Sequence, residues 1–224
     1  MLRLRRQLHR VADARKAPYM QAYMKSAMPY HGVPAPILER TCKQLFGGAE
    51  LASAQVWRDL VRQLWLGATH REERYAAILL CGDKRAAAFQ TPEAMRLYEE
   101  IVVTGAWWDY VDPVASRRVG PILLNYPAPM RKMMLAWSRS GNMWKRRTSI
   151  LCQLGSAGDT DLKLLYGCIQ PSLASNEFFL KKAIGWALRQ YARTDPQEVT
   201  RYVRRNEGRL SNLSRREALK RIAT

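Results

Sequence analysis

The sequence predicts an all-α protein, built as an α-solenoid of stacked helical pairs with a basic concave surface. Segments with helical periodicity fill nearly the whole chain, and almost none has the alternation of a strand. Similar helical segments also recur along the chain at a roughly constant spacing. Finally, 37 Lys and Arg face 19 Asp and Glu, so the formal net charge is +18. The first two observations predict the fold class, and the third predicts its charge.

The expected helices begin and end at residues that favour helix termini. Segment 34–47 has Pro in its first turn and Gly at its end. Segment 53–67 begins with Ser and ends with Gly, and Val56, Leu60 and Leu64 are spaced to form one apolar face.

The third expected helix, 91–105, has Thr91 as its cap, Pro92 in its first turn and Gly105 at its end. Six further helices are expected at 127–141, 142–155, 159–174, 176–192, 195–208 and 213–223.

Three helical segments repeat the same pattern, a basic residue followed by an apolar face: "ERYAAILL", "RRTSILCQL" and "KKAIGWALRQ". Their basic residues, Arg74, Arg147 and Lys182, stand 73 and 35 residues apart, and Asp112 precedes Arg147 by 35. A repeat near 40 residues made of paired helices indicates HEAT-like units. Equivalent helices of such units line one curved surface, so basic residues recurring there would make that surface positive. A generic helical domain with accidental spacing is the alternative.

The charge excess favours a polyanionic partner, because each neutralised phosphate releases condensed counterions. Nucleic acid is favoured over an acidic membrane, since no strongly amphipathic basic segment with exposed aromatics stands out. No apolar segment follows the arginine-rich start, which argues against a signal peptide and favours a basic helix over a transit peptide. We expect a cytoplasmic protein.

The cysteines and histidines predict neither disulfides nor a metal centre. The four cysteines lie in or beside apolar helical segments, without a C-x-x-C pair, at Cys42, Cys81, Cys152 and Cys168. They are expected to be reduced core residues. The three histidines, His9, His31 and His70, are too few and too scattered to predict a zinc or iron site. No cofactor and no metal is expected.

Several segments together resemble the AlkD-type DNA alkylation-repair glycosylases. They are "QAYMKSAMPYHGV", "REERYAAILL", "WWDYVDPVA", "WKRRTSILCQL" and "FFLKKAIGWALRQYARTDPQEV", so the likeness spans most of the chain in the same order. The resemblance implies a single HEAT-like domain over residues 1–224, acting as a monomer on duplex DNA. It also implies excision of positively charged alkylated bases such as 3-methyladenine and 7-methylguanine.

By this resemblance, four residues carry the function: Trp108, Asp112, Arg147 and Trp186. Two local features depart from the family pattern. Pro113 directly follows the acid, and Arg146 stands beside Arg147, so either guanidinium could meet the phosphate. Tyr23 and Lys182 are further candidates for DNA contact, and the basic tail from residue 200 onward could follow the phosphate backbone.

These residue types suit the chemistry. A cationic alkylated base leaves as a neutral molecule, so the enzyme must chiefly stabilise the oxocarbenium-like sugar. A fixed carboxylate at Asp112 would do so electrostatically and could position water. The indoles of Trp108 and Trp186 favour a nearby cation, and an arginine can hold a phosphate through two hydrogen bonds.

Simpler roles remain open for each residue taken alone. Asp112 before Pro113 could be only a helix N-cap. Trp108 and Trp186 could be core residues, Arg147 could be solvated or salt-bridged, and Tyr23 could be packed. For the whole protein, the alternatives to an enzyme are a non-catalytic HEAT-like module that binds unusual DNA or RNA, and a protein-binding scaffold. The combination of Trp, Asp, Arg and Trp favours the glycosylase.

Overall fold

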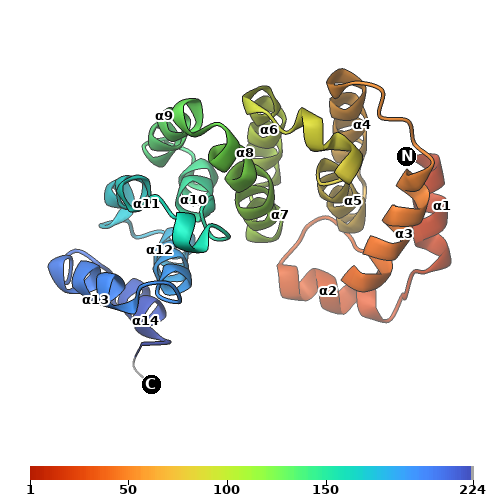
Figure 1. Ribbon diagram of the computed structural model, residues 1–224. Helices are drawn as coiled ribbons and strands as arrows, with labels where there is room; N and C mark the ends of the chain where they lie inside the picture. Colours follow the sequence, from red (N-terminus) through yellow and green to blue (C-terminus); the bar gives the residue numbers. More distant parts are fainter. Residues whose placement is uncertain (223–224) are drawn as a thin grey trace. The chain divides into compact units, whose positions relative to one another are not determined.

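The computed structural model describes residues 1–222 and divides the chain into two compact units, Met1–Gln90 and the residues from Thr91 onward (Figure 1). Over these described residues the regular structure is entirely helical, without a β-strand. The all-α prediction is therefore confirmed.

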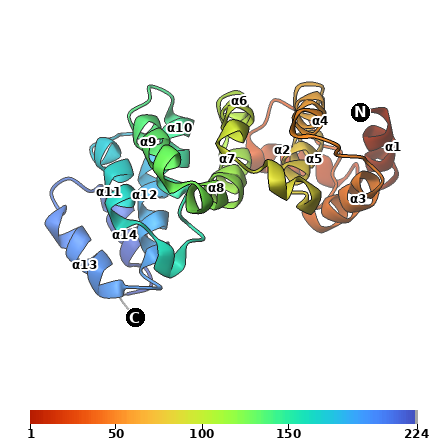
Figure 2. The ribbon, with the colours of Figure 1, turned by 45° about the horizontal axis from the view of Figure 1, so that its top comes forward.

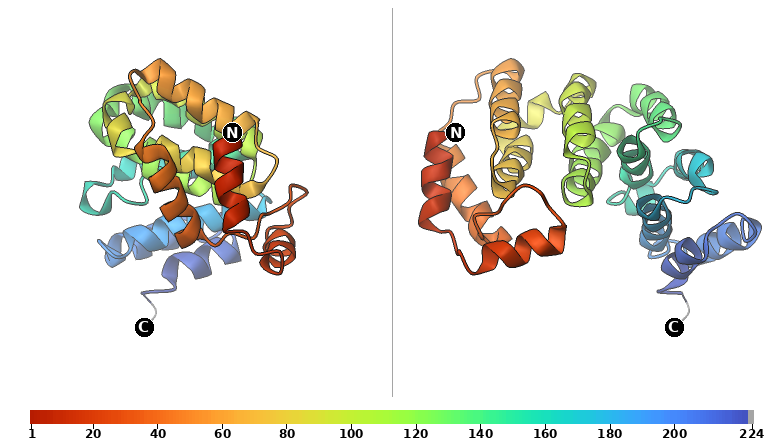
Figure 3. Two further views of the ribbon diagram at one scale, coloured as in Figure 1. Left: turned by 90° about the vertical axis from the view of Figure 1, so that its right-hand side faces the viewer. Right: turned by 180° about the vertical axis from the view of Figure 1, so that it is seen from behind.

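The first unit consists of five α-helices and a short 3₁₀ helix: α1 (Leu2–Arg10), α2 (Lys16–Met24), α3 (Ala35–Gly47), α4 (Ala54–Leu66), α5 (Arg71–Cys81) and η1 (Lys84–Phe89). Helix α5 packs against both α3 and α4, and α1 lies along α3 (Figure 3). The core of this first unit includes Leu4, Leu8, Trp57, Val61 and Trp65, each at most 1% exposed.

The apolar face expected for α4 is only partly right. Ser53 caps this helix through its Oγ, which accepts from the N–H of Val56. The buried face, however, consists of Trp57, Val61, Leu64 and Trp65, whereas the side chain of Val56 is exposed. Two adjacent apolar stripes on this helix could face the core, one with Val56 and one with Trp57. The stripe with the indole of Trp57 is buried, because its burial removes more apolar surface from water.

Within residues 91–222, the second unit contains nine α-helices and several shorter turns. The α-helices are α6 (Met95–Gly105), α7 (Trp108–Val114), α8 (Gly120–Asn125), α9 (Pro127–Ser138), α10 (Met143–Leu151), α11 (Leu162–Ile169), α12 (Phe178–Tyr191), α13 (Pro196–Arg205) and α14 (Asn212–Leu219). The shorter turns are η2 (Pro92–Ala94), η3 (Ala115–Val119), η4 (Ala157–Asp159) and η5 (Gln170–Ser172).

Most expected helix starts lie close to the observed ones, because side-chain caps set several of them. Asn142 accepts from the N–H groups of Trp144 and Lys145, and Asp195 accepts from that of Glu198. Two starts differ by three residues or more from expectation: Pro92 begins a 3₁₀ turn rather than α6, and Asp161 rather than residue 159 caps α11. Several expected ends lie too late, since the helices expected at 142–155, 159–174 and 213–223 end at Leu151, Ile169 and Leu219. Residue 223 itself lies outside the described residues.

Helix α10 is central to the second unit, where it packs against α6, α7, α9, α11 and α12 (Figure 2). Helix α14 packs closely on α12 at Gly185, where a Cβ atom would lie 2.5 Å from that of Glu217. Any larger residue at position 185 would therefore push these helices apart, beside the candidate residue Trp186.

None of the helices in the described part of the chain has the length and apolar character needed to cross a membrane.

The four cysteines are buried, as expected for core residues. Burial raises the pKa of both Cys42 and Cys168 to about 12, so their thiolate forms are scarce at neutral pH.

We predict that none of the cysteines of the native protein reacts within minutes with a thiol reagent such as dithionitrobenzoate. After unfolding in guanidinium all four should react. Rapid labelling of a native thiol would show that the helices around that cysteine open readily.

Candidate functional site

Asp112 lies inside α7 rather than at a helix start. Trp107 is the residue before the helix, with extended backbone angles (φ −152°, ψ 146°), and Asp112 is the fifth residue of the helix that follows. The N-cap role considered for Asp112 is therefore wrong. A cap must precede the helix so that its side chain can reach the free N–H groups of the first turn, and Asp112 is already within it.

The backbone after Asp112 is unusual. Pro113 is inside α7, and the chain continues through the π-helical turn η3 into α8. Proline lacks the N–H that would close a normal helical hydrogen bond, and a wide π turn accommodates such an irregularity. The hydroxyl of Ser116 donates to the carbonyl oxygen of Asp112 (2.8 Å). Pro113, which departs from the family pattern, thus lies where the helix widens directly after the carboxylate.

Asp112 and Arg147 form a buried, bidentate ion pair. Nε of Arg147 donates to Oδ1 of Asp112 at 2.7 Å, and Nη2 donates to Oδ2 at 2.8 Å. Asp112 is 8% exposed and Arg147 4% exposed. Because both carboxylate oxygens accept from the guanidinium, the pair consists of two ionised groups. It joins α7 to α10 across 35 residues of sequence.

A third group completes the surroundings of Arg147. Its Nη1 donates to the main-chain carbonyl oxygen of Phe179, at the start of α12, at 2.5 Å. The guanidinium also lies 5.9 Å from the centre of the Phe179 ring. Arg147 thereby links α7, α10 and α12 with three hydrogen-bonding contacts.

Two opposing effects act on Asp112. Burial raises the pKa of Asp112 above its ordinary value, while the hydrogen bonds and positive charge of Arg147 lower it and limit that rise. The carboxylate thus lies in a poorly hydrated position, where one specific partner stabilises its charged form. Perturbed acids of this kind concentrate at functional sites.

An aromatic cluster fixes the ends of the same three helices. The ring centres of Trp107 and Phe179 lie 5.4 Å apart, those of Trp144 and Phe179 5.1 Å, and those of Trp107 and Trp144 6.2 Å. Each residue stands at or beside the first residue of α7, α10 or α12. Trp107 thus has a packing role, and the sequence offered no sign that Phe179 would join it.

The two candidate tryptophans are half-buried rather than core residues. Trp108 begins α7 and lies four residues before Asp112, so the two share one face of the helix. Trp186 is in α12, seven residues after Phe179, and so lies on the same side of that helix as Phe179. Each indole therefore retains a surface that a ligand can reach.

Trp186 lines an open cleft of about 390 Å³ together with Arg189, Gln190, Arg193, Lys220 and Arg221. Four of these six residues are basic. Such a lining suits a phosphate-rich ligand better than an apolar one.

The remaining DNA-contact candidates of the second unit already have partners. Arg146 donates to the hydroxyl of Ser172 and to the carbonyl oxygen of Pro171. Lys182 pairs with Glu217 at 3.2 Å. That Arg146 or Arg147 meets a phosphate stays a prediction. Arg147 is buried, however, so it is not one of the exposed basic residues expected to line a positive surface.

In the first unit, Tyr23 is 75% exposed on α2, and Tyr19 one turn earlier is 83% exposed. The alternative that Tyr23 is packed is therefore wrong. Arg74, the basic residue of the first repeat, lies over the ring of Trp65 with its guanidinium carbon 4.7 Å from the ring centre.

Comparison with known proteins gives one consistent result. The family model described as "DNA alkylation repair enzyme" matches residues 4–222. Among solved structures, the chain is similar to a predicted DNA alkylation repair enzyme from Enterococcus faecalis, with a TM-score of 0.85 and 30% sequence identity. The similarity covers 95% of this chain and 97% of the other. No match was found among curated proteins.

The geometry leads to a prediction about Arg147. Replacing it with alanine removes the partner of a buried carboxylate, so Arg147→Ala should lower the free energy of unfolding by about 3–5 kcal/mol. The matched control is Lys145→Ala, two residues earlier in α10, whose more exposed pair with Glu99 should be worth about 1 kcal/mol or less. Urea unfolding monitored by circular dichroism measures both. Equal, small losses in the two variants would contradict a structural role for the pair.

Proposed function

Because the chain belongs to the family of DNA alkylation repair enzymes, we propose that it is a monofunctional DNA glycosylase. Its substrates would be positively charged alkylated bases in duplex DNA, such as 3-methyladenine and 7-methylguanine, and the reaction is hydrolysis of the N-glycosidic bond. This would be the first step of base excision repair. The observation that carries the proposal is the Asp112 carboxylate, whose charged form Arg147 stabilises, on the same helix face as Trp108.

Asp112 would stabilise the charge that develops on the sugar. An alkylated purine that is already cationic needs no proton to leave, so no general acid is required and the barrier lies in forming an oxocarbenium-like sugar. A carboxylate fixed in advance stabilises that cation without having to reorient during the reaction. Burial strengthens the interaction, because less water screens the charge.

Arg147 would act as a positioning residue for Asp112. A carboxylate has about four lone-pair sites, and the bidentate pair occupies one on each oxygen. The remaining sites can face the sugar or accept from an attacking water. The carbonyl oxygen of Phe179 in turn fixes Arg147, so the carboxylate plane is set by two helices besides its own.

Trp108 and Trp186 would contact the cationic sugar and base through the faces of their indoles, which attract positive charge. The basic cleft beside Trp186 would hold phosphates of the damaged strand. Exposed Tyr23 would add a DNA contact from the first unit.

One observation favours a second candidate, a non-catalytic module that binds unusual DNA or RNA. Asp112 has only 11% of its side chain exposed, and its pair with Arg147 could serve the fold alone. The experiment must therefore separate a structural pair from a catalytic carboxylate.

Replacing both members of the pair makes that separation. In Asp112→Asn alone the buried guanidinium would lose its counter-charge, so lower stability and lower activity would be confounded. In Asp112→Leu/Arg147→Met, apolar side chains of similar volume replace the pair, which is often neutral or stabilising. We predict that this double variant keeps its melting temperature within a few degrees and still binds duplex DNA. Its single-turnover release of 7-methylguanine should fall by about 100–1,000-fold.

Chromatography of free bases released from methylated duplex DNA measures this rate, with circular dichroism on the same samples as the control for folding. Release at close to the wild-type rate by a folded double variant would assign the pair to the fold and favour the binding module.

The proposed mechanism also predicts which lesions are excised. A site that stabilises the sugar but supplies no proton to the leaving group should act only on bases that already carry a positive charge. We expect release of 3-methyladenine and 7-methylguanine, and release of uracil or hypoxanthine at least 100-fold more slowly under the same conditions. Comparable rates for neutral and cationic bases in defined duplexes would rule the mechanism out.

A further inference from the structure

The last two helices of the second unit, α13 and α14, line an open cleft of about 450 Å³. It is distinct from the cleft beside Trp186, with which it shares only Lys220. Its other lining residues are two aliphatic, three basic and one acidic: Val203, Leu219, Arg204, Arg215, Arg216 and Glu207. None of these six belongs to the candidate site described above, so this cleft requires an explanation of its own.

The two clefts lie on different sides of α14. Ser214 and Glu217 face α12, because a Cβ atom at Gly185 would lie 3.0 Å from the carbonyl oxygen of Ser214 and 2.5 Å from the Cβ atom of Glu217. At about 100° per residue, Arg215 and Leu219 point to the other side of the same helix. A partner bound between α13 and α14 would therefore not occupy the side of α14 that holds the proposed phosphate-binding cleft.

The floor of the cleft is aliphatic. Val203 belongs to the buried face of α13 and is 5% exposed, and Leu219 is half-buried at the end of α14. Arginine side chains add the methylene groups of their stems to such walls while their charged ends stay in water. Among the described residues, no aromatic side chain lines the cleft. Single-stranded nucleic acids bind largely by stacking bases on aromatic rings, so this lining does not suit them.

The rim of the cleft is positively charged and only partly neutralised. Nη1 of Arg215 lies 2.6 Å from Oε1 of Glu207, so the rim already accepts one carboxylate. The side chain of Glu207 is 68% exposed, and a surface pair of this kind is weak enough for a ligand carboxylate to exchange with it. Arg204 and Arg216 are exposed, and neither forms an ion pair with another residue that the structure describes.

We propose that the cleft between α13 and α14 binds an acidic peptide segment of a partner protein. Aliphatic side chains of the peptide would cover Val203 and Leu219, and its carboxylates would pair with the arginines of the rim. Charge complementarity of this kind speeds encounter and selects acidic partners. The proposal does not rest on base excision.

Duplex DNA fits this cleft less well than an acidic peptide does. Its phosphates could reach the basic rim, but its backbone presents no aliphatic group that would cover the floor. The carboxylate of Glu207 would also repel a phosphate at the same rim. An acidic peptide with aliphatic side chains uses both the floor and the rim.

The test measures the binding of a short fluorescein-labelled peptide, in which aspartates and glutamates surround a pair of leucines, to the full chain by fluorescence anisotropy. A second labelled peptide has serines in place of the leucines. Arg204→Glu/Arg216→Glu reverses the two rim charges that lack an ion pair. Its matched control is Lys43→Glu/Lys84→Glu, which makes the same change in net charge on two exposed lysines of the first unit. Circular dichroism checks the folding of both variants.

At physiological salt, the wild type should bind the leucine peptide at least about 10-fold more tightly than the serine peptide, because the floor buries the leucines. Arg204→Glu/Arg216→Glu should weaken binding of the leucine peptide at least about 10-fold, because like charges then face each other. The lysine control should stay within about threefold of the wild type, since salt screens distant charges. Excess unlabelled duplex DNA should not displace the peptide.

The proposal is overturned if the wild type does not bind the leucine peptide, or if the serine peptide binds as tightly. The peptide comparison uses the unmodified chain, so it decides the matter even if a variant folds poorly. Equal weakening in the two charge-reversal variants would also overturn it, because binding would then follow net charge alone. Displacement of the peptide by duplex DNA would assign the cleft to nucleic acid instead.

Discussion

The guanidinium of Arg147 is a full positive charge in the interior of the second unit, and that interior can hold it only with suitable partners. Asp112 supplies the opposite charge, and the carbonyl oxygen of Phe179 supplies a further acceptor. Removing either partner would leave a buried charge or an unsatisfied donor, each of which costs several kcal/mol in a protein interior. Helices α7, α10 and α12 must therefore stay close enough for Asp112 and the carbonyl oxygen of Phe179 to contact Arg147.

The same requirement gives the candidate site its precision. A carboxylate that is held by a bidentate partner has little rotational freedom, and the aromatic cluster of Trp107, Trp144 and Phe179 fixes the three helix ends around it. Pro113 and the π turn place an irregular stretch of backbone directly after Asp112. Rigid support on one side and irregular backbone on the other are common where a helix presents a functional group.

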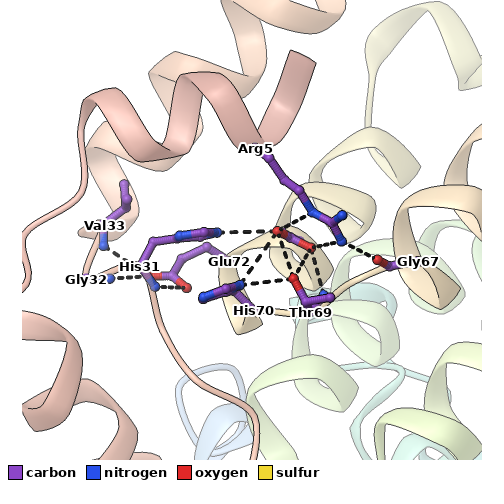
Figure 4. A network of polar contacts seen from close by, with 9 residues as sticks. Arg5, His31, Gly32, Val33, Gly67, Thr69, His70 and Glu72 are labelled. Atoms are coloured by element: carbon purple, nitrogen blue, oxygen red, sulfur yellow. Dashed lines mark hydrogen bonds and ion pairs between the residues drawn. The ribbon is translucent and has the colours of Figure 1, made fainter. Parts of the chain in front are cut away.

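The first unit uses a comparable arrangement for a different set of groups. There Glu73 is completely buried and accepts from Arg5, from the N–H of Thr69 and from His31, while Glu72 holds the main chain of the segment before α3 (Figure 4). In both units a buried acid joins segments that are distant in sequence. Membership of the DNA alkylation repair family concerns the whole chain, yet only the second unit contains the pair proposed to act on DNA bases.

The helical class, most helix starts and the candidate residues could all be predicted from the sequence. Helical periodicity and the capping residues Asn142 and Asp195 are local properties, so they can be read from a short window. Periodicity was less decisive where two apolar stripes compete, as in α4, because the tertiary contacts of Trp57 select the buried one. The start of α7 at Trp108 rather than after Asp112 was also missed, since the pattern Asp-Pro is typical of a helix start.

The contacts of each candidate residue could not be predicted, because they depend on the tertiary structure. The spacing of Asp112 and Arg147 indicated equivalent places in a repeat, but it contained no sign that the two side chains pair with each other. Phe179 takes part through a main-chain carbonyl, which any residue possesses and no pattern reveals. The histidines are far apart in sequence and adjacent in space, because Glu72 and Gly32 direct the segment carrying His31 onto α5. Local sequence sets backbone preference, whereas partners across 35 residues or more depend on how the helices pack.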